Sequence, residues 1–352
     1  MKKKIINFNK KELTPSTVTK RKDPENLKKE DEHLFQHEAY KNINAVYNLT
    51  IKNILFTGWG TIVIPNNKNL PPEFEYPTTT ILKQSIGLYY FNLIKSALKG
   101  DLLIIRQPVI FILENSSMGY FHWVTDVLPR LMVVEENKKF PVVLPQSFRE
   151  VAFINDSLDA LGFKTIFLRE EQNALLQRMN FITHFAKSGN YNDEMINKLR
   201  DSFYKSYNLH QNSDDLIYIS RSKSSKRKIK NEDEVWGFLK QFSFKKIYCE
   251  DLSFENQAKL FSKSRLIISI HGAGLTNMLF MNKAGKVLEV RYAADQINNC
   301  YYTLASALKL KYYYLQCQPV TLGENQHTAD LSVDMALFKN TVKNMVSSIN
   351  GI

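Results

Sequence analysis

The chain has 352 residues, of which 44% are hydrophobic, and a formal net charge of +12. This length and apolar content suit a two-domain globular protein and argue against a disordered or fibrous chain. No apolar run reaches the roughly 18–20 residues of a membrane-spanning helix, and the Lys-rich N-terminus lacks the apolar segment of a signal peptide. Three scattered cysteines, Cys249, Cys300 and Cys317, favour a reducing compartment over a disulfide framework or a zinc cluster.

The positive charge is confined to two segments. Residues 1–30 carry ten Lys or Arg against four Asp or Glu, giving +6, and residues 221–230 carry six Lys or Arg and no acid, giving another +6. The rest of the chain sums to zero, which argues against a long nucleic-acid footprint. Residues 1–32 are polar and poorly periodic, so we expect a flexible basic leader. A peripheral contact between this leader and anionic lipid is a further expectation.

The first third of the chain is weakly patterned. Residues 43–64 contain short apolar strands interrupted at Thr57–Gly60, and residues 65–80 are a proline-rich loop. Residues 86–98 suit either a helix or a strand.

From Val109 onward the pattern becomes regular. Strands are predicted at 109–113 and 142–144, and helices at 120–136 and 148–161. Strands that alternate with helices indicate βαβ units and a largely parallel sheet. Pro129 lies inside the first of these helices and should bend it, because proline lacks the amide hydrogen that a helix needs.

A second α/β series follows a boundary placed near residues 186–212, where 192–207 is predicted to be a linking helix. Its predicted strands are 216–220, 247–248, 266–270, 286–290 and 311–315, and its predicted helices are 231–242, 253–261 and 299–308. The resulting plan is a leader at 1–32, an acceptor-side α/β domain at 33–200 and a nucleotide-sugar-binding α/β domain at 201–352.

The segment Leu266–Phe280, LIISIHGAGLTNMLF, is a short apolar strand, a glycine turn and a helix-compatible run. A strand followed by a glycine turn and a helix start is how α/β proteins bring free backbone N–H groups to an anion. The candidate phosphate-binding residues are His271, Gly272, Ala273, Gly274, Thr276 and Asn277. A purely structural role for His271 is the alternative.

Four segments in order resemble the glycosyltransferase 61 family: GYFHWVTDVLPR at 119–130, the basic stretch from Ile219 to Glu232, HGAGLTN within 266–280, and VLEV at 287–290. The resemblance covers roughly residues 105–316. It implies the GT-B plan of two Rossmann-like domains facing a cleft, and transfer of a sugar from a nucleotide-sugar donor, with UDP favoured. It also implies an oligosaccharide or glycolipid acceptor, as in bacterial capsule or lipopolysaccharide synthesis, and a cytoplasmic enzyme, peripheral on the inner face of the membrane.

His122 and Asp126 are four residues apart, so they share one face of a helix. A histidine and a carboxylate on one face can form a general base and its orienting partner. Asp126 is the first choice for the base that deprotonates the acceptor hydroxyl, and His122 is the second. The structural alternative is an ion pair between Asp126 and Arg130, again four residues on.

The second basic segment offers cations to a leaving diphosphate. Arg221 and Arg227 are the first candidates, because guanidinium groups grip phosphate in a bidentate manner. The lysines between them suit solvated companions. Asn231 belongs to the resemblance as a donor contact, but an N-cap on the following helix explains it nearly as well.

Glu289 is predicted to end a buried strand, where a carboxylate can accept both ribose hydroxyls. A pairing with Arg291 is the alternative. Gln257 is a weaker candidate near the nucleotide. No Asp-x-Asp pair occurs in the chain, so we expect no metal ligands and no metal cofactor.

The predicted function is thus an inverting, metal-independent glycosyltransferase without a nucleic-acid partner. The alternative from another class is a non-catalytic nucleotide- or RNA-binding protein that uses residues 221–230, which would bind less tightly as salt rises. A hydrolase using His122 with Ser116 or Ser117 is disfavoured, because the sequence has no G-x-S-x-G elbow.

Overall fold

The computed structural model places the chain in two compact units. It describes residues 9–65, 81–134, 136, 138–211, 214–321 and 323–350. Unit 1 comprises residues 1–17 and 42–188, and unit 2 comprises residues 18–41 and 189–352. The units divide at 188/189, compared with 200/201 in the sequence-based plan, and residues 18–41 belong to unit 2. Each unit is an α/β structure, as predicted.

Unit 1 is built on a mixed sheet of nine strands, with the order β10-β9-β8-β11-β4-β5-β6 and with β1 on β4 and β7 on β11. Its strands are β1 (Asn9–Thr14), β4 (Val46–Thr57), β5 (Ile62–Pro65), β6 (Ile81–Gln84), β7 (Leu102–Ile105), β8 (Val109–Phe111), β9 (Val142–Pro145), β10 (Thr165–Leu168) and β11 (Asn173–Ile182). The two longest, β4 and β11, pair antiparallel. Strands β8, β9 and β10 continue in parallel from β11, so the predicted βαβ pattern is present on this side of the sheet.

The helices of unit 1 are α3 (Ile86–Leu98), α4 (Tyr120–His122), α5 (Leu128–Met132) and α6 (Ala152–Leu161), with a 3₁₀ turn at Gln146–Glu150 before α6. Residues 86–98, which the sequence left open between helix and strand, are therefore helical. The predicted bend at Pro129 takes the form of a π-helical turn, Trp123–Val127, between α4 and α5. The N–H of Leu128 reaches the carbonyl of Trp123, five residues back, just before the proline that cannot donate.

Unit 2 contains a six-stranded sheet of order β13-β12-β14-β15-β16-β17, parallel except for β17. Its strands are β12 (Asp215–Ile219), β13 (Lys245–Ile247), β14 (Ser264–Ile270), β15 (Lys286–Tyr292), β16 (Lys311–Pro319) and β17 (Leu331–Ser332). The first five follow the doubly wound order 2-1-3-4-5, in which the order reverses between β12 and β14.

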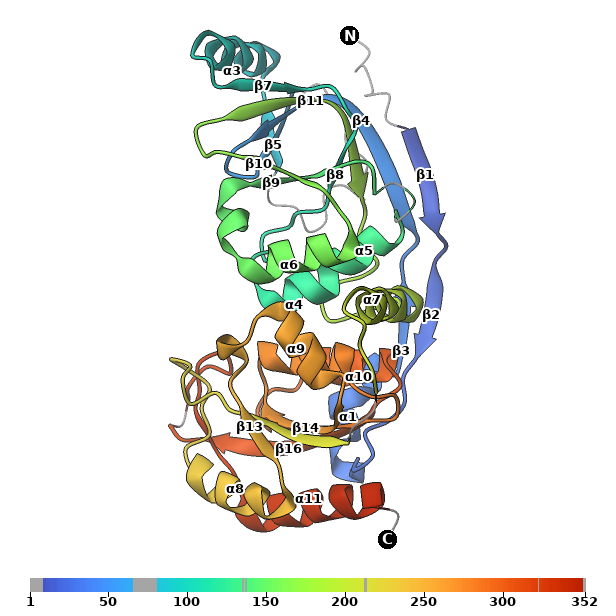
Figure 1. The fold of residues 1–352 in the computed structure, drawn as a ribbon, viewed down its shortest axis with the longest axis vertical. Helices are drawn as coiled ribbons and strands as arrows, with labels where there is room; N and C mark the ends of the chain where they lie inside the picture. Colours follow the sequence, from blue (N-terminus) through green and yellow to red (C-terminus); the bar gives the residue numbers. More distant parts are fainter. Residues whose placement is uncertain are drawn as a thin grey trace. The chain divides into compact units, whose positions relative to one another are not determined.

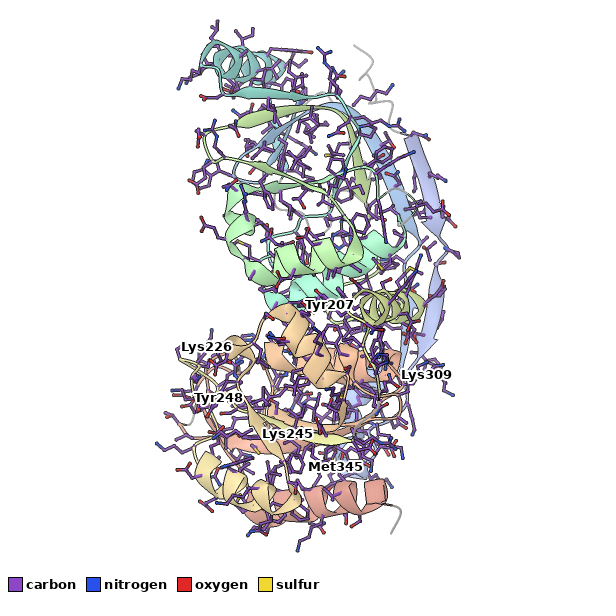
Figure 2. The ribbon with its side chains drawn as sticks, viewed as in Figure 1. Tyr207, Lys226, Lys245, Tyr248, Lys309 and Met345 are labelled. Atoms are coloured by element: carbon purple, nitrogen blue, oxygen red, sulfur yellow. The ribbon has the colours of Figure 1, made fainter. Side chains whose placement is uncertain are left out.

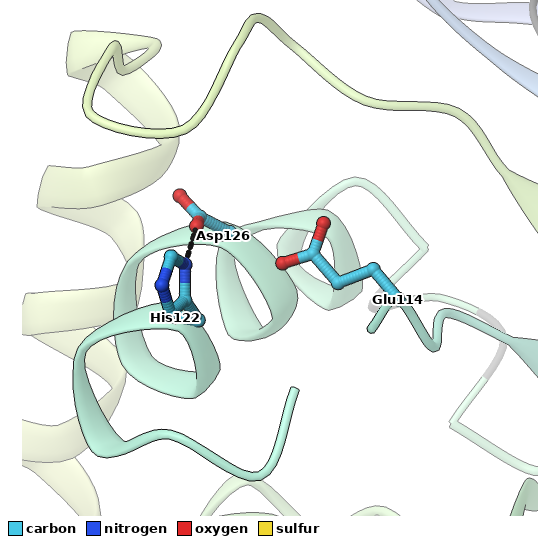
Figure 3. A group of neighbouring side chains, drawn as sticks. All are labelled: Glu114, His122 and Asp126. Atoms are coloured by element: carbon cyan, nitrogen blue, oxygen red, sulfur yellow. Dashed lines mark hydrogen bonds and ion pairs between the residues drawn. The ribbon is translucent and has the colours of Figure 1, made fainter. Parts of the chain in front are cut away.

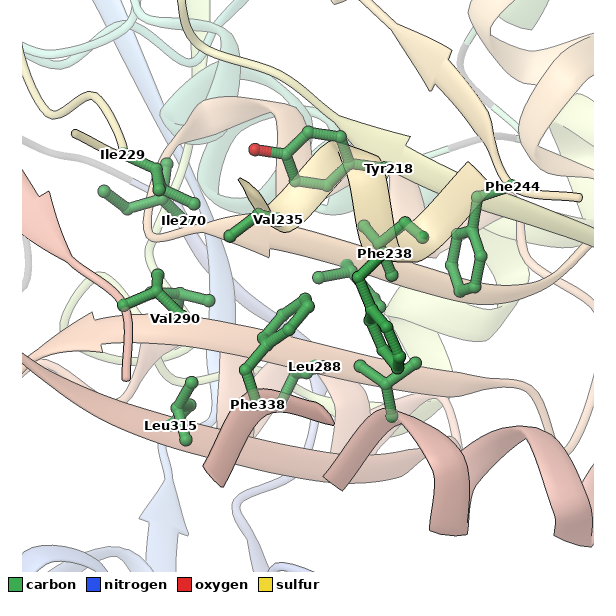
Figure 4. Close-up of a cluster of buried hydrophobic side chains, with 14 of the residues drawn as sticks. Tyr218, Ile229, Val235, Phe238, Phe244, Ile270, Leu288, Val290, Leu315 and Phe338 are labelled. Carbon is green, nitrogen blue, oxygen red and sulfur yellow. The ribbon is translucent and has the colours of Figure 1, made fainter. Parts of the chain in front are cut away.

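Helices cover both faces of this sheet (Figure 1). They are α7 (Asp193–Ser206), α8 (Glu232–Leu239), α9 (Phe254–Phe261), α10 (Cys300–Ala307) and α11 (Met335–Asn350), and residues Ala273–Phe280 form a 3₁₀ helix, η8. Figure 4 shows the core between the sheet and helices α8 and α11, where Phe238 and Phe338 meet residues such as Leu288 from the strands. Ser253 caps α9 through its side chain, as predicted.

The segment predicted to be a flexible leader is largely ordered, which corrects that expectation for its described part. Strand β1 pairs with β4, and β2 (Thr17–Lys20) pairs with β3 (Tyr40–Ile43). Short helical turns at 29–38, including α1 (Glu32–Phe35), bury Phe35 against the rings of Tyr302 and Tyr314 in unit 2. Composition alone predicted disorder because it does not report the backbone pairing of β1 or the burial of single apolar residues such as Phe35. Residues 1–8, and most of the proline-rich loop at 65–80, lie outside the described residues.

Among the described residues, no helix combines the length and the apolar content that a bilayer crossing requires. The cysteines Cys249, Cys300 and Cys317 all have free thiols.

Candidate active site in unit 1 and anion site in unit 2

The first of two clusters of functional groups lies in unit 1, around the π-helical turn (Figure 3). Nδ1 of His122 lies 2.8 Å from Oδ2 of Asp126, so the predicted pair is formed. Ser188, in the loop between β11 and α7, donates from its hydroxyl to the same carboxylate oxygen at 2.6 Å. The side chain of His122 is about one-third exposed and that of Asp126 is nearly buried. A histidine whose Nδ1 is held by a carboxylate presents Nε2 for proton transfer.

Glu114 adds a second carboxyl group to this cluster. It lies just beyond the carboxyl end of β8 and is 9% exposed. Burial, reinforced by the charge of Asp126, raises the pKa of Glu114 to about 7, although Arg130 and His122 act in the opposite direction. The hydrogen bond with Asp126 raises the pKa of His122 against the effect of burial, with help from the charges of Asp126 and Glu114.

A small cavity of about 230 Å³ opens beside these groups, lined in part by Glu114, His122, Asp126, His184 and Ser188. Burial holds the pKa of His184 well below its ordinary value, and the charge of Arg130 acts in the same direction. His184 is therefore neutral at physiological pH, and its Nδ1 lies 3.7 Å from Oε2 of Glu114. The cavity thus joins a neutral histidine, a carboxyl group with a raised pKa and the His122–Asp126 pair.

Arg130 takes no part in the predicted alternative, an ion pair with Asp126. It is fully buried and donates to the carbonyls of Ile112, at 2.8 Å, and of Ile182. Arg130 thereby fixes β8 and β11 to helix α5, and its guanidinium leaves Asp126 to His122 and Ser188.

Ligand atoms of Glu114, His122 and Asp126 all lie within 4.8 Å of one another. These residue types also bind divalent cations, so the geometry is compatible with a metal ion as well as with proton transfer. In the structure, however, Oδ2 of Asp126 already accepts from both His122 and Ser188.

The second cluster lies in unit 2, where the strand order reverses. Ligands of doubly wound sheets bind beyond the carboxyl ends of the strands at this point. Arg221 follows β12, and His271 and Gly272 follow β14. The fold therefore brings together the two segments that the sequence singled out separately, the basic stretch and the glycine turn.

Arg221 lies directly against the turn. A Cβ atom on Gly272 would fall 2.6 Å from Nη1 of Arg221, so only glycine lets the guanidinium lie there. Burial lowers the pKa of Arg221, and the charge of Arg227 lowers it further. The Nε atoms of both arginines are buried without a hydrogen-bond partner, and neither forms an ion pair with a carboxylate among the described residues. Two half-buried cations of this kind favour an anion.

His271 is held by a relay of buried groups. Its Nδ1 lies 2.5 Å from Oε1 of Glu289, and Oε2 of Glu289 accepts from the hydroxyl of Tyr312 at 2.5 Å. The amide of Asn298 lies 3.2 Å from Nε2, and the ring of Tyr301 packs edge-on at a centroid distance of 4.9 Å. The ring of His271 is thus oriented from both nitrogens.

Several predicted donor contacts are corrected by this geometry. Glu289 lies in the middle of β15, not at its end, and protein groups engage both of its carboxylate oxygens. It therefore orients the ring of His271 and is not free to accept ribose hydroxyls, the role that the sequence had predicted. Its alternative partner, Arg291, donates to Asn299 and to main-chain carbonyls.

Thr276 and Asn277 are fully buried in η8, so they cannot reach a ligand in this conformation. Asn277 donates to Gln257 at 2.8 Å and to the carbonyl of Gly274 at 3.1 Å, which ties the turn to α9. His271, Ala273 and Gly274 remain partly accessible, and the buried Gly272 admits Arg221.

Asn231 neither caps α8 with its side chain nor faces the turn. Its amide oxygen accepts from the N–H of Val333, and its amide nitrogen donates to the carbonyl of Val333. The neighbouring Glu232 accepts from Tyr218, Ser220 and Lys246. Both residues are explained by packing within unit 2.

Three of the four lysines in residues 221–230 are exposed. Lys223 lies 4.5 Å from the ring centroid of Tyr248 and pairs with Asp251 at 2.5 Å. Lys226 is exposed, and Figure 2 labels it together with Tyr248. The segment therefore presents two half-buried arginines and a solvated set of lysines, as its residue types indicated.

Sequence reasoning missed Glu114, His184, Ser188, Asn298 and Tyr312. Glu114 had a usable signal, because it directly follows an apolar run that ends a parallel strand. The others are joined to the site only by the fold and carry no local pattern.

The geometry defines an α/β protein with a candidate acid–base cluster in unit 1 and a candidate anion site at the switch point of unit 2. Comparison with known proteins is consistent with this class: residues 120–288 match the family model described as Glycosyltransferase 61. The comparisons confirm the resemblance predicted from the sequence: this part of the chain is similar to the glycosyltransferase 61 family.

Three relatives show how far the similarity extends. The chain is 31% identical over 100 residues to the EGF domain-specific O-linked N-acetylglucosamine transferase of Drosophila melanogaster, covering 28% of this chain and 19% of the relative. It is 35% identical over 114 residues to protein O-linked-mannose beta-1,4-N-acetylglucosaminyltransferase 2 of Xenopus laevis, covering 32% of this chain and 18% of the relative. It is 23% identical over 277 residues to the EGF domain-specific O-linked N-acetylglucosamine transferase of Rattus norvegicus, covering 67% of this chain and 52% of the relative. The chain thus spans about half of the third relative and about a fifth of the first two.

Proposed function

We propose that the chain is an inverting glycosyltransferase that moves a sugar from a nucleotide-sugar donor, with UDP favoured, to a hydroxyl of a glycan acceptor. One observation carries the proposal. The segment that matches the family, residues 120–288, contains both the His122–Asp126 pair and the two switch-point arginines, Arg221 and Arg227, whose Nε atoms are buried without a hydrogen-bond partner. Sugar transfer needs a base for the acceptor proton and cations for the leaving diphosphate.

In the proposed reaction, the acceptor oxygen forms a bond to the anomeric carbon as the bond from that carbon to the diphosphate breaks. His122 takes the acceptor proton at Nε2, and Asp126 orients the ring through Nδ1. This assignment reverses the order of preference drawn from the sequence, because the carboxylate of Asp126 is already engaged by His122 and Ser188. Arg221, Arg227 and the N–H groups at the start of η8 receive the diphosphate.

The remaining parts of the proposal rest on family analogy. They are the GT-B plan, the absence of a divalent-metal requirement, a cytoplasmic location peripheral on the inner face of the membrane, and a role in capsule or lipopolysaccharide synthesis. The relatives reported above are animal enzymes whose names specify EGF domains or O-linked mannose. The acceptor is therefore proposed only as a glycan or glycolipid hydroxyl.

A nucleotide screen tests the donor site. Thermal shift would be measured with UDP, GDP, CMP, ADP and a short RNA, with and without EDTA, for the wild type, Arg227→Ala and Lys226→Ala. We expect a shift of a few degrees with one nucleoside diphosphate that persists in EDTA, disappears in Arg227→Ala and is kept in the exposed-lysine control. Salt-sensitive RNA binding without any mononucleotide response would reject the transferase in favour of a nucleic-acid-binding protein.

A transfer assay tests the base. With the donor identified, His122→Ala and Asp126→Asn should each lower kcat, His122→Ala by about 10²–10⁴-fold, while donor KM changes little. Unchanged kcat in both variants would place the base elsewhere. A loss of activity in EDTA that Mg²⁺ or Mn²⁺ restores would show that the Glu114–His122–Asp126 cluster or another site needs a metal.

A further inference from the structure

Helix α3 is attached to unit 1 by a narrow face. Of its side chains only Tyr89 and Ser96 are buried, and Leu93 is partly buried. Tyr89 packs with Leu55 and Val63 in a small cluster of its own, and its hydroxyl donates to the carbonyl of Asn53. The remaining faces of this 13-residue helix are turned away from the domain that holds it.

Those outward faces are apolar. Phe91, Ile94 and Leu98 follow the i, i+3, i+7 spacing of one helical stripe and are 60%, 56% and 84% exposed. Further large apolar residues are exposed on the helix and on the strands before and after it: Leu82, Ile86, Leu88, Tyr90, Leu103 and Ile104. Single exposed apolar residues are ordinary, but a contiguous apolar face on a surface helix marks a contact with a partner or a membrane.

The segment that carries this face has a net positive charge. Residues 81–106 contain three Lys and one Arg against one Asp, a net charge of +3, and α3 itself contains no acidic residue. Lys95 follows Ile94 and Lys99 follows Leu98, so two exposed lysines flank the apolar stripe. A helix with an apolar stripe and flanking lysines is typical of binding at the interface of an anionic bilayer.

A cavity of about 540 Å³ lies beside the helix and is lined in part by Lys95, Lys99 and Trp59. The Trp59 side chain is 71% exposed, and tryptophan favours the polar–apolar boundary of a bilayer. Asp101 and Glu171 also line the cavity, so the attraction for anions belongs to the lysines on the helix and not to the cavity floor.

We propose that the α3 face, consisting of the exposed apolar residues of α3 with Lys95, Lys99 and Trp59, docks onto an anionic lipid bilayer. The charge argues against a second copy of this chain as the occupant, because a symmetric contact would set the same cationic residues against each other. The assignment deepens the peripheral membrane location in the proposed function, and vesicle binding tests it independently of sugar transfer. It places the membrane contact on α3 instead of on the basic leader.

Vesicle co-sedimentation of the full chain tests the assignment. The probes are vesicles of phosphatidylcholine alone and of phosphatidylcholine with phosphatidylglycerol, at low and high salt. We expect binding to the anionic vesicles only, reduced by about tenfold or more in Lys95→Gln/Lys99→Gln. Phe91→Ser/Ile94→Ser should lose the part of the vesicle binding that persists at high salt, because that part comes from apolar contact with the bilayer. Because these side chains are exposed, both variants should keep the melting temperature of the wild type.

The matched control is Leu337→Ser/Lys339→Gln, the same kind of change on the exposed side of helix α11 in unit 2, which should bind like the wild type. Absence of wild-type binding, or binding that survives both α3 variants, would overturn the proposal. So would a concentration-dependent dimer in sedimentation equilibrium that Phe91→Ser/Ile94→Ser dissociates, since the face would then be a contact between two copies.

Discussion

Glu289 and His271 are joined by a hydrogen bond of 2.5 Å between Oε1 and Nδ1, although the carboxylate lies in the middle of a fully buried strand. Burial raises the pKa of Glu289, but the charge and hydrogen bond of His271, the charge of Arg291 and the hydroxyl of Tyr312 lower it by more, so its pKa lies below the ordinary value. The ionised carboxylate is therefore part of the folded state and fixes the ring that faces the glycine turn.

Replacing Glu289 with Gln should weaken both folding and donor binding. A carboxyl group with a depressed pKa stabilises the fold above its unfolded pKa, and this stability disappears as pH falls through the folded value. Glu289→Gln should therefore cost about 1–3 kcal/mol near neutral pH and reduce the acid sensitivity of unfolding. Urea unfolding at several pH values measures this, with exposed Glu234→Gln as the control. An unchanged unfolding free energy would contradict the relay.

Glu114 should produce the opposite pH dependence. Its folded pKa of about 7 lies above the ordinary value of 4.5, so the folded state retains a proton that the unfolded chain releases. This contribution is fully present below about pH 4.5 and is lost as pH rises through about 7, a change on the order of 3 kcal/mol. Glu114→Gln keeps a neutral side chain at all pH values and should be more stable than the wild type at about pH 8.

Melting temperatures measured between about pH 5 and pH 8 check this expectation, with the exposed Glu170→Gln as the control. In a transfer assay, removing the Glu114 charge should also lower the pKa of His122, because that charge raises it. The acidic limb of the pH–rate profile, which reports the pKa of the base, would then move to lower pH. Parallel stability curves for wild type and Glu114→Gln would show that Glu114 is ionised throughout.

Gly272→Ala tests the close approach of Arg221 to the turn. The added Cβ would lie 2.6 Å from Nη1, so the guanidinium must move away from the start of η8. Diphosphate affinity should fall about tenfold or more, because a charge-assisted hydrogen bond contributes about 1.5–3 kcal/mol, while folding changes little. Calorimetric titration with the nucleoside diphosphate measures this affinity.

The control is Gly237→Ala in α8, where a Cβ meets nothing within 4 Å. It should leave nucleotide affinity intact and stabilise the protein by about 0.5–1 kcal/mol, because alanine suits a helix interior better than glycine. Equal nucleotide affinity in Gly272→Ala and the wild type would mean that Arg221 does not act at the turn.

Phe35→Ala tests whether the N-terminal segment is an integral part of unit 2. The ring is 1% exposed and lies 5.0 Å, centroid to centroid, from both Tyr302 and Tyr314. Its removal should cost about 3–5 kcal/mol, as for other buried aromatic residues. A loosely attached leader would instead tolerate the change, so an unfolding free energy within about 0.5 kcal/mol of the wild type would contradict the structure.

The sequence predicted the part of the fold that repeats a simple pattern. Strands with apolar runs, such as 266–270 and 286–290, and helices with stripes, such as the one carrying Trp123, were found because periodicity reports which face is buried. The sequence did not predict that η8 is a 3₁₀ helix or that residues 123–127 form a π-helical turn. Both depend on hydrogen bonds that tertiary packing selects.

For the site, sequence predicted which residues are chemically capable but not which are accessible. The spacing of His122 and Asp126 was sufficient, since one helical turn joins them. Glu289 was predicted to lie near the end of its strand because the apolar run stops at Val290, but the strand continues through Arg291 and Tyr292. Ser188 could not be found from sequence, because its contact with Asp126 spans 62 positions.

The chain passes between the two units at 17/18, 41/42 and 188/189, which has a consequence for its synthesis. Residues 18–41 leave the ribosome early, but Arg21 bonds the carbonyl of Thr303, 282 positions later. At typical translation rates this partner arrives roughly 15–60 s afterwards. Unit 1 can assemble co-translationally once residue 188 has emerged, whereas residues 18–41 wait for the C-terminal half. A nascent chain stalled before the last strands would therefore expose Phe35 and its neighbours to chaperones.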